Sequence, residues 1–279
     1  MFNVLDYKNN MEPYADLLKR IINESDIVLE VLDSRLVDYS RNAQIEELIK
    51  KVHKPRIFVI NKSDMVSKKV VQKDIEKLNK EGVAVYVTRE DKRTFKILIS
   101  KIRQVFAKYG KTQVIDEEHR AAKADIVVGV VGYPNVGKSS VINGISFSKK
   151  TIVSKRAGTT HGVHWIKASN EIKLIDTPGV IPLEYNDEVK LGLISARDSH
   201  RLKQPDLVAA RIVQMFIEKN KKAFEDYYGI KIDDETKSPY EIIEEIALKK
   251  SHLKKGGLAD EIRMSIIIVK DWQDGKLKL

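Results

Sequence analysis

Residues 126–140 read IVVGVVGYPNVGKSS, and this stretch decides the fold. Its first six residues, Ile126–Val131, are apolar without alternation, which is typical of a strand buried on both faces of a parallel sheet. Gly132–Ser139 then matches the pattern G-x-x-x-x-G-K-[ST], a loop whose backbone N–H groups wrap around phosphates at the start of a helix. A strand, this loop and a helix in that order predict an α/β phosphate-binding domain.

Individual residues of the loop have separate expected tasks. Lys138 is expected to reach the β- and γ-phosphates and so to act in catalysis, while the Ser139 hydroxyl is expected to ligate Mg²⁺. The nucleotide is expected to contact a run of consecutive residues: Asn135, Val136, Gly137, Lys138, Ser139 and Ser140. The alternative, an ordinary strand-to-helix turn, is disfavoured because the whole eight-residue pattern is present.

A second motif, Asp176-Thr-Pro-Gly179, follows the apolar run Ile172–Ile175. A carboxylate at the end of a buried strand is costly unless it has a partner. We therefore expect Asp176 to hold Mg²⁺ through water and the Gly179 N–H to approach the γ-phosphate, as a catalytic switch. Alone, this tetrapeptide is also compatible with a surface turn. Val163–Ser169 and Ile172–Ile175 predict a hairpin across Asn170.

Gly158-Thr159-Thr160 lies between these two motifs. A loop in this position is expected to supply a hydroxyl to Mg²⁺ and to the γ-phosphate during catalysis. Thr160 is the preferred residue for this role and Thr159 is the alternative. Either threonine is also suited simply to capping a turn.

Asn61-Lys62-Ser63-Asp64 follows the strand-like run Pro55–Ile60 and is the motif that selects the base. An ionised carboxylate accepts hydrogen bonds and donates none. Asp64 therefore suits guanine, which offers two adjacent donors, and is left with an unpaired charge beside adenine. Asn61 and Lys62 are expected to bind the nucleotide with it. Thr88 is expected at the edge of the base, although VTRED is only a partial match to the usual SAK.

The remaining pattern predicts the layout of the chain. Strand-like runs at 26–32, 55–60 and 83–87 alternate with helical patterns at 41–51, 67–81 and 92–111, which indicates a parallel sheet with helices on both faces. After residue 185 the pattern is helical, with a capping box at Ser238–Glu241 and an amphipathic stretch at Asp260–Gln273. We therefore divide the chain into a nucleotide-binding domain at 1–185 and a helical domain at 186–279.

Composition excludes several classes of protein. There is no cysteine, which rules out disulfides and thiolate chemistry, and no apolar run is long enough to cross a bilayer. The N-terminal stretch lacks the pattern of a secretion signal, so a cytoplasmic protein is expected. Residues 186–279 carry 18 basic and 17 acidic side chains, which leaves 32 and 23 for residues 1–185. This basic excess favours RNA as a partner or, with about even odds, reflects solvated lysine-rich helices.

The order of the motifs resembles a known family. NKSD and VTR precede GYPNVGKSS, GTT and DTPG, so the fourth and fifth motifs of ordinary GTPases here stand before the first, second and third. The chain resembles the YlqF/RbgA-type family of circularly permuted GTPases over nearly its whole length. Leu32–Arg35 and Ser40–Asn42 are similar to its DAR…SRN signature. Its C-terminal domain is similar in two places, at Lys255–Gly257 with Asp260 and at Asp271-Trp272 with Gly275-Lys276.

The resemblance implies a P-loop GTPase fold of α/β class with permuted motif order, followed by a smaller all-helical domain. It also implies a Mg²⁺-dependent enzyme that hydrolyses GTP to GDP and phosphate and assists assembly of the large ribosomal subunit. Nucleotide-dependent binding to rRNA or to the pre-ribosome, by a monomer, is expected. Asn135 resembles the loop asparagine that helps to hold K⁺ in potassium-activated relatives; alternatively it only shapes the turn.

Catalysis is where the chain departs from the common pattern. Val180 occupies the place where many GTPases carry a glutamine, and an apolar side chain cannot activate water. The histidine of an N-terminal GHM motif, present in some relatives, is missing here, which leaves His161 and His164 as local candidates or as merely solvated residues. Slow intrinsic turnover is expected. Two alternatives stay open: a nucleotide-gated RNA-binding module with negligible catalysis, and a GTPase in another RNA process, such as tRNA modification or small-subunit maturation.

Overall fold

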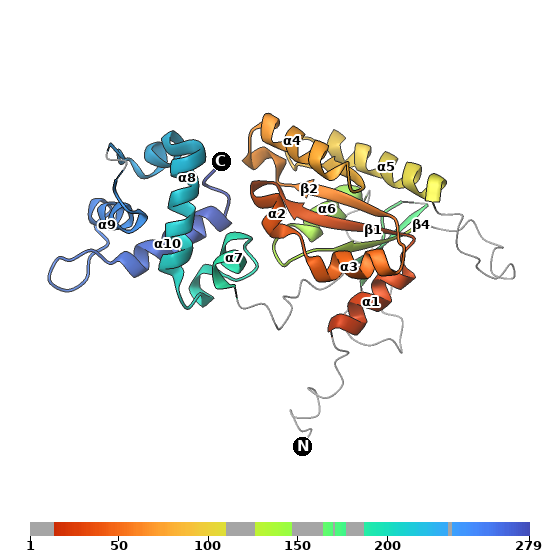
Figure 1. The fold of residues 1–279 in the computed structure, drawn as a ribbon, viewed down its shortest axis with the longest axis horizontal. Helices are drawn as coiled ribbons and strands as arrows, with labels where there is room; N and C mark the ends of the chain where they lie inside the picture. Colours follow the sequence, from red (N-terminus) through yellow and green to blue (C-terminus); the bar gives the residue numbers. More distant parts are fainter. Residues whose placement is uncertain (1–13, 110–125, 147–163, 170, 177–186, 234–235) are drawn as a thin grey trace, which may run out of the picture. The chain divides into compact units, whose positions relative to one another are not determined.

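The computed structural model contains two compact units, which are described separately (Figure 1). The first comprises Met1–Asp64 and Lys68–Pro182, and the second comprises Met65–Ser67 and Leu183–Leu279. The residues that the structure describes are 14–109, 126–146, 164–169, 171–176, 187–233 and 236–279.

A six-stranded sheet with the order β3-β2-β1-β4-β6-β5 organises the first unit. β5 is antiparallel to β6, and the other neighbouring pairs are parallel. The hairpin predicted from the sequence is therefore confirmed as the β5–β6 pair, while Asn170 lies outside the described residues. The strands are β1 (Ile27–Asp33), β2 (Arg56–Asn61), β3 (Val83–Tyr86), β4 (Ile126–Val131), β5 (His164–Lys167) and β6 (Ile172–Asp176).

Helices cover both faces of this sheet, as the alternation of elements predicted. They are α1 (Tyr14–Glu24), α2 (Val37–Ser40), α3 (Ala43–Lys51), α4 (Lys68–Leu78), α5 (Arg93–Tyr109) and α6 (Lys138–Ile145), with short 3₁₀ segments η1 (Ser34–Leu36) and η2 (Ser63–Met65). Side chains two apart on a strand share a face. On β1, Val28 packs between α1 and α3, and Leu32 packs with Leu78 of α4, so these helices lie on one face.

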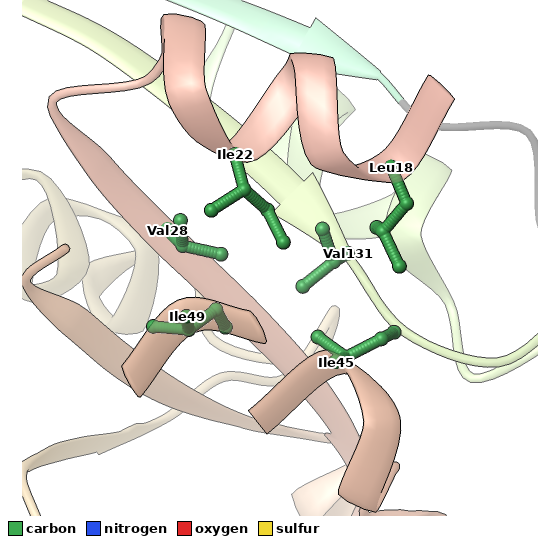
Figure 2. Packing of buried hydrophobic residues seen from close by; sticks show 6 residues of the cluster. All are labelled: Leu18, Ile22, Val28, Ile45, Ile49 and Val131. Carbon is green, nitrogen blue, oxygen red and sulfur yellow. The ribbon is translucent and has the colours of Figure 1, made fainter. Parts of the chain in front are cut away.

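Figure 2 shows how that face is filled. Six buried side chains pack together there. They are Leu18 and Ile22 of α1, Ile45 and Ile49 of α3, and Val28 and Val131 of the central strands β1 and β4.

On the other face α5 and α6 pack closely, because Gly144 leaves room for the ring of Phe95: a Cβ atom at this glycine would lie 2.2 Å from that ring. The central strand β4 has Val128, Val130 and Val131 fully buried, which confirms the expectation of a strand covered on both faces.

The second unit is helical in the residues that the structure describes. Its elements are α7 (Glu188–Leu193), η4 (Ser199–Arg201), α8 (Pro205–Tyr228), α9 (Pro239–Lys249) and α10 (Glu261–Gln273). Phe216 and Phe224 of α8 form an aromatic core with Trp272 of α10, whose ring stands edge-on to Phe216. The Trp272 indole N–H donates to the Leu193 carbonyl oxygen at 2.7 Å, so its polar atom is satisfied inside the core.

Local signals explain where these helices begin and bend. The capping box predicted at Ser238 is confirmed: its hydroxyl accepts from the Glu241 N–H, and the Glu241 carboxylate accepts from the Ser238 N–H. Asp260 caps α10 with its side chain alone, which accepts from the Arg263 N–H. α8 is kinked at Asn220, where the backbone leaves helical geometry and the side-chain oxygen accepts from Ala223 N–H.

Candidate functional site

The predicted motifs follow the carboxyl ends of the parallel strands. In a parallel sheet these ends meet at one edge, where ligands bind to α/β folds. Asp33 ends β1 and is paired in register with Asn61, which ends β2. Val130, near the end of β4, is paired with Asp176, which ends β6. The base motif, the phosphate loop and the carboxylate expected to hold Mg²⁺ are therefore brought to the same edge.

The phosphate loop turns through three residues with positive φ: Gly132 at 143°, Asn135 at 60° and Gly137 at 99°. At Gly132 a side chain is excluded, because a Cβ atom would lie 2.7 Å from the Val31 carbonyl oxygen. Asparagine is one of the few residues with a side chain that tolerates the left-handed region. The loop then enters α6 at Lys138, which directs the amino end of that helix toward the predicted phosphate position.

Lys138 is buried and turned back across its own loop. Its ammonium donates to the carbonyl oxygens of Gly132 and Tyr133, each at 3.1 Å. Burial lowers the pKa of Lys138 to about 8, and the nearby charge of Asp176 opposes this shift. Because phosphate oxygens carry more charge than carbonyls, they are stronger partners for this desolvated ammonium.

Asn61 joins the base motif to the phosphate loop. Its side-chain amide is buried and donates to the Val136 carbonyl oxygen at 2.9 Å. Gly137 lies against the same amide, and a Cβ atom there would come within 2.0 Å of the Asn61 Nδ2. The two motifs therefore support each other's backbone before any nucleotide is considered.

The predicted base-binding residues are linked in a similar way. The Thr88 hydroxyl donates to Oδ1 of Asp64 at 2.7 Å, so the loop after β3 orients the carboxylate expected to read guanine. The Ser63 hydroxyl donates to the Val87 carbonyl oxygen at 3.1 Å and ties the same two loops together. The structure thus gives Thr88 a contact with Asp64, while its place at the base edge stays a prediction.

Two residues at the end of β1 also reach the base motif. The Lys62 ammonium donates to the buried Asp33 carboxylate at 2.7 Å, and the Ser34 hydroxyl donates to the Lys62 carbonyl oxygen at 2.6 Å. In the sequence, Asp33 and Ser34 stand out only as part of the stretch that resembles a family signature. The available signal was a carboxylate at the end of an apolar strand, the same signal that singled out Asp176.

Arg89, in the loop after β3, was missed at the sequence level. Its guanidinium donates to the Ser140 hydroxyl in the first turn of α6. Its charge also contributes to lowering the pKa of Lys62, after the larger effects of burial and of Arg35. Lys62, Arg89 and Lys138 therefore concentrate positive charge at this edge, which suits an anionic ligand.

The residues at this edge also fit Mg²⁺, which prefers oxygen ligands and keeps several of its waters. Ser139 is exposed in the first turn of α6, and Asp176 lies one strand away. Within the described ranges there is no cluster of three or more histidine, aspartate or glutamate side chains able to hold a metal. An ion shared among a hydroxyl, one carboxylate, water and phosphate does not need such a cluster.

The remaining predicted residues lie mostly outside the part of the chain that the structure describes. Thr159, Thr160, His161, Gly179 and Val180 lie outside the described residues, and His164 is the first residue of β5. Their expected roles stay predictions, as do the roles of the residues that the structure does place. Among the described residues, no helix combines the length and hydropathy of a membrane span.

Comparison with known proteins agrees with this arrangement. Residues 127–247 match the sequence profile of a family described as "50S ribosome-binding GTPase". An uncharacterized GTP-binding protein of Methanocaldococcus jannaschii is 34% identical over 277 residues, which cover 99% of this chain and 69% of that protein. Ribosome biogenesis GTPase A of Priestia megaterium is 28% identical, with coverages of 90% and 86%.

A solved structure shares the fold. The crystal structure of GNP-bound YlqF from T. maritima superimposes with a TM-score of 0.60 at 23% identity, covering 96% of both chains. Several eukaryotic relatives are longer, and this chain spans about half of their length.

Proposed function

We propose that this chain, which belongs to the YlqF/RbgA-type family of circularly permuted GTPases and is a GTP hydrolase, acts in assembly of the large ribosomal subunit. The observation that carries the assignment of its nucleotide site is the hydrogen bond from Asn61 to Val136, which joins the base motif to the phosphate loop. The role in assembly is supported by relatives named ribosome biogenesis GTPase A, which align over most of the chain.

In the proposed complex, guanine lies beside the loops that follow β2 and β3. Asp64 accepts from the two donors on the edge of the base, and Thr88 keeps that carboxylate oriented. Asn61 supports the phosphate loop, and Lys62 lies along the base. Adenine is rejected because it leaves the Asp64 charge without a donor.

The phosphates lie in the loop before α6, where they contact residues 135–140. Lys138 exchanges its carbonyl partners for β- and γ-phosphate oxygens and stabilises charge that develops on them during hydrolysis. Thr160 and Gly179 are proposed to contact the γ-phosphate from the two switch segments.

Two cations are proposed. Mg²⁺ would be held by Ser139, Thr160 and, through water, Asp176, and when bound it neutralises phosphate charge. K⁺ would be held beside Asn135. The left-handed backbone of Asn135 is equally compatible with a residue that only shapes the turn, so the K⁺ arm of the experiment below decides between these roles.

For contact with rRNA we propose the turn between α9 and α10. Lys254 N–H donates to the Leu258 carbonyl oxygen and Gly257 N–H to the Lys254 carbonyl oxygen, which closes a tight turn. Gly256 and Gly257 both have positive φ and no atom within 4 Å of where a Cβ would be, so their backbone is open to a partner. Lysines beside an open backbone suit a phosphodiester chain.

Nucleotide state is proposed to control release from the pre-ribosome. The Gly179 motif, which is expected to sense the γ-phosphate, is followed in the chain by the helical unit that carries this turn. Unchanged affinity for large subunits between the GDP and GTP-analogue forms would contradict this control.

We also propose that the protein is a cytoplasmic monomer.

The deciding experiment measures GTP hydrolysis in K⁺ and Na⁺ buffers, with and without purified large ribosomal subunits. We expect slow intrinsic turnover that large subunits stimulate, and loss of that turnover in Lys138→Ala. Tight GTP binding with no turnover under any condition would favour the second candidate, a nucleotide-gated RNA-binding module, for which the apolar Val180 is the specific observation. Stimulation only by other RNAs would instead place the GTPase in another RNA process.

A further inference from the structure

The end of β1 holds Lys62 of the base motif at both its side chain and its backbone. The Asp33 carboxylate accepts from the Lys62 ammonium at 2.7 Å. The Ser34 hydroxyl donates to the Lys62 carbonyl oxygen at 2.6 Å. Lys62 has a φ of 58°, which a residue with a side chain rarely adopts, so a bond to its carbonyl helps to keep an uncommon backbone state.

The groups that hold Lys62 are themselves firmly placed. Asp33 and Ser34 are 1% and 2% exposed. Arg35 donates to both oxygens of Asp33 through its guanidinium, and to one of them through its backbone N–H. The Asp33 N–H in turn donates to the Ser40 hydroxyl at 3.0 Å. A carboxylate with this many donors has little freedom to follow a moving lysine, so the lysine must follow the carboxylate.

The charges around Lys62 make Asp33 necessary. Arg35 and Arg89 lie close enough for their positive charges to lower the pKa of Lys62, in addition to the larger effect of burial. Asp33 is the acidic group that opposes these effects. Without its negative charge, a desolvated ammonium would face two guanidinium groups, and the Lys62 side chain would leave that position.

The second tripeptide, Ser40–Asn42, also makes contacts that hold the end of β1 in place. Arg41 pairs with Glu46 of α3 and with Glu81, while the Asn42 side chain caps α3 by accepting from two backbone N–H groups. Together with the Ser40 bond to Asp33, these contacts anchor the segment that follows β1. The DSR and SRN tripeptides thus form one unit whose contact with the nucleotide site is Lys62.

We propose that Asp33 and Ser34 are positioning residues for the guanine site, and that they act by holding Lys62 against the base. This inference rests on the proposed base site. It gives the tripeptides at 33–35 and 40–42 a function in nucleotide affinity. Asp33 does not touch the nucleotide in this proposal, so its effect must pass through Lys62.

A double-mutant cycle on GDP affinity tests that dependence. The four full-length proteins are wild type, Asp33→Asn, Lys62→Met and the double variant, and the measurement is Kd for a fluorescent GDP analogue. We expect Asp33→Asn to weaken binding on the order of 10- to 100-fold, and to have almost no further effect when Lys62 is already methionine. Additive losses, or an unchanged Kd in Asp33→Asn, would overturn the proposal.

The preference between GDP and xanthosine diphosphate shows whether the positioning role fails alone or together with the base site on which it depends. Asp64→Asn should shift preference from GDP toward xanthosine diphosphate, in which a carbonyl replaces the exocyclic amine. Asp33→Asn should lower the affinities for both nucleotides and leave their ratio as in wild type. A normal shift in Asp64→Asn with no effect of Asp33→Asn rejects only the positioning role. No shift in Asp64→Asn rejects the base site and the positioning role together.

Further variants distinguish a loss of positioning from a loss of folding. They are needed because Asp33→Asn also leaves Arg35 without its carboxylate partner. Ser34→Ala removes only the bond to the Lys62 carbonyl, and we expect it to weaken GDP binding several-fold with the same nucleotide ratio. If Asp33→Asn does not fold, the test depends on Ser34→Ala. An unchanged Kd for GDP in Ser34→Ala would then overturn the proposal. The matched control is Asp38→Asn, whose carboxylate pairs with Lys77 on the surface at 2.6 Å and should leave Kd unchanged.

Discussion

The side-chain amide of Asn61 donates a 2.9 Å hydrogen bond to the carbonyl oxygen of Val136, a residue 75 positions later in the chain. In this permuted chain the base motif is made before the phosphate loop. The bond is therefore the point at which two distant parts of the sequence become one nucleotide site. Both partners are buried, so the bond is shielded from competition by water.

Replacement of Asn61 should damage both halves of the site. Asn61→Ala leaves the Val136 carbonyl oxygen buried without this donor, at a cost of about 1–3 kcal/mol in the free energy of unfolding. GDP affinity should fall by at least about 10-fold, because the phosphate loop loses its support. Urea denaturation and titration with a fluorescent nucleotide measure the two effects.

The control for this prediction is Asn79→Ala. The Asn79 side chain is also hydrogen-bonded to the backbone, but it accepts from Ala84 N–H, and it lies before β3 and not at the carboxyl edge of the sheet. It should lower stability and leave GDP affinity unchanged. Equal loss of affinity in both variants would contradict the linking role of Asn61.

Gly137→Ala should abolish nucleotide binding. Its φ of 99° strains any residue with a side chain, and the new Cβ would also collide with the Asn61 amide at 2.0 Å. Gly256→Ala is the matched control, because its φ of 91° imposes similar strain but nothing lies within 4 Å. Both variants should lose roughly 1–2 kcal/mol of stability from backbone strain. Calorimetric titration with GDP should detect binding only in Gly256→Ala.

Arg89→Gln should weaken binding of the phosphates but not of the nucleoside. The guanidinium of Arg89 contacts Ser140 in the first turn of α6, where a phosphate is expected, and it adds positive charge there. GDP affinity should fall on the order of 10-fold and depend less on salt, while the weak affinity for guanosine stays as in wild type.

Arg93→Gln serves as the control for Arg89. Arg93 is in the same stretch, and its side chain is 85% exposed and paired with Asp91. If Arg89→Gln binds GDP with the affinity and salt dependence of wild type, this arginine has no part in phosphate binding.

Glu30 should make stability depend on pH. It is 1% exposed on β1. Burial raises its pKa to about 7, with a smaller contribution from Glu46, while Arg56, the backbone N–H of Asn42 and Arg41 oppose the shift. The ordinary pKa of glutamate is 4.5, so between these values the folded chain holds a proton that the unfolded chain releases. The resulting stabilisation is complete below pH 4.5 and is lost as pH rises through about 7.

The measurement compares wild type with Glu30→Gln by urea denaturation at several pH values across that window. The wild-type free energy of unfolding should fall relative to that of the variant by about 1 kcal/mol for each pH unit. Carboxylates with lowered pKa, such as Asp33, affect both proteins equally and cancel in this difference. A difference that is constant with pH would mean that Glu30 titrates normally.

Much of the fold followed from local sequence patterns. The apolar run Ile126–Val131 predicted a strand covered on both faces, and the structure places it as the interior strand β4. The capping box at Ser238 and the hairpin before Asp176 were also predicted, because caps, tight turns and hairpins depend on residues a few positions apart. By contrast, the 24-residue α8 with its kink at Asn220 was not predicted in detail, since its shape depends on packing in the helical unit.

For the candidate site, too, some features followed from the sequence and others only from the tertiary structure. The sequence by itself determined which residues have the chemistry to bind a guanine nucleotide, because the base motif and the phosphate loop are contiguous and their spacing is diagnostic. Only the tertiary structure decided which of them touch: Asn61 reaches the phosphate loop, Asp33 holds Lys62, and Arg89 reaches α6. These pairs are far apart in the chain. They meet because parallel pairing of β1, β2, β3 and β4 brings the carboxyl ends of these strands to one edge of the sheet.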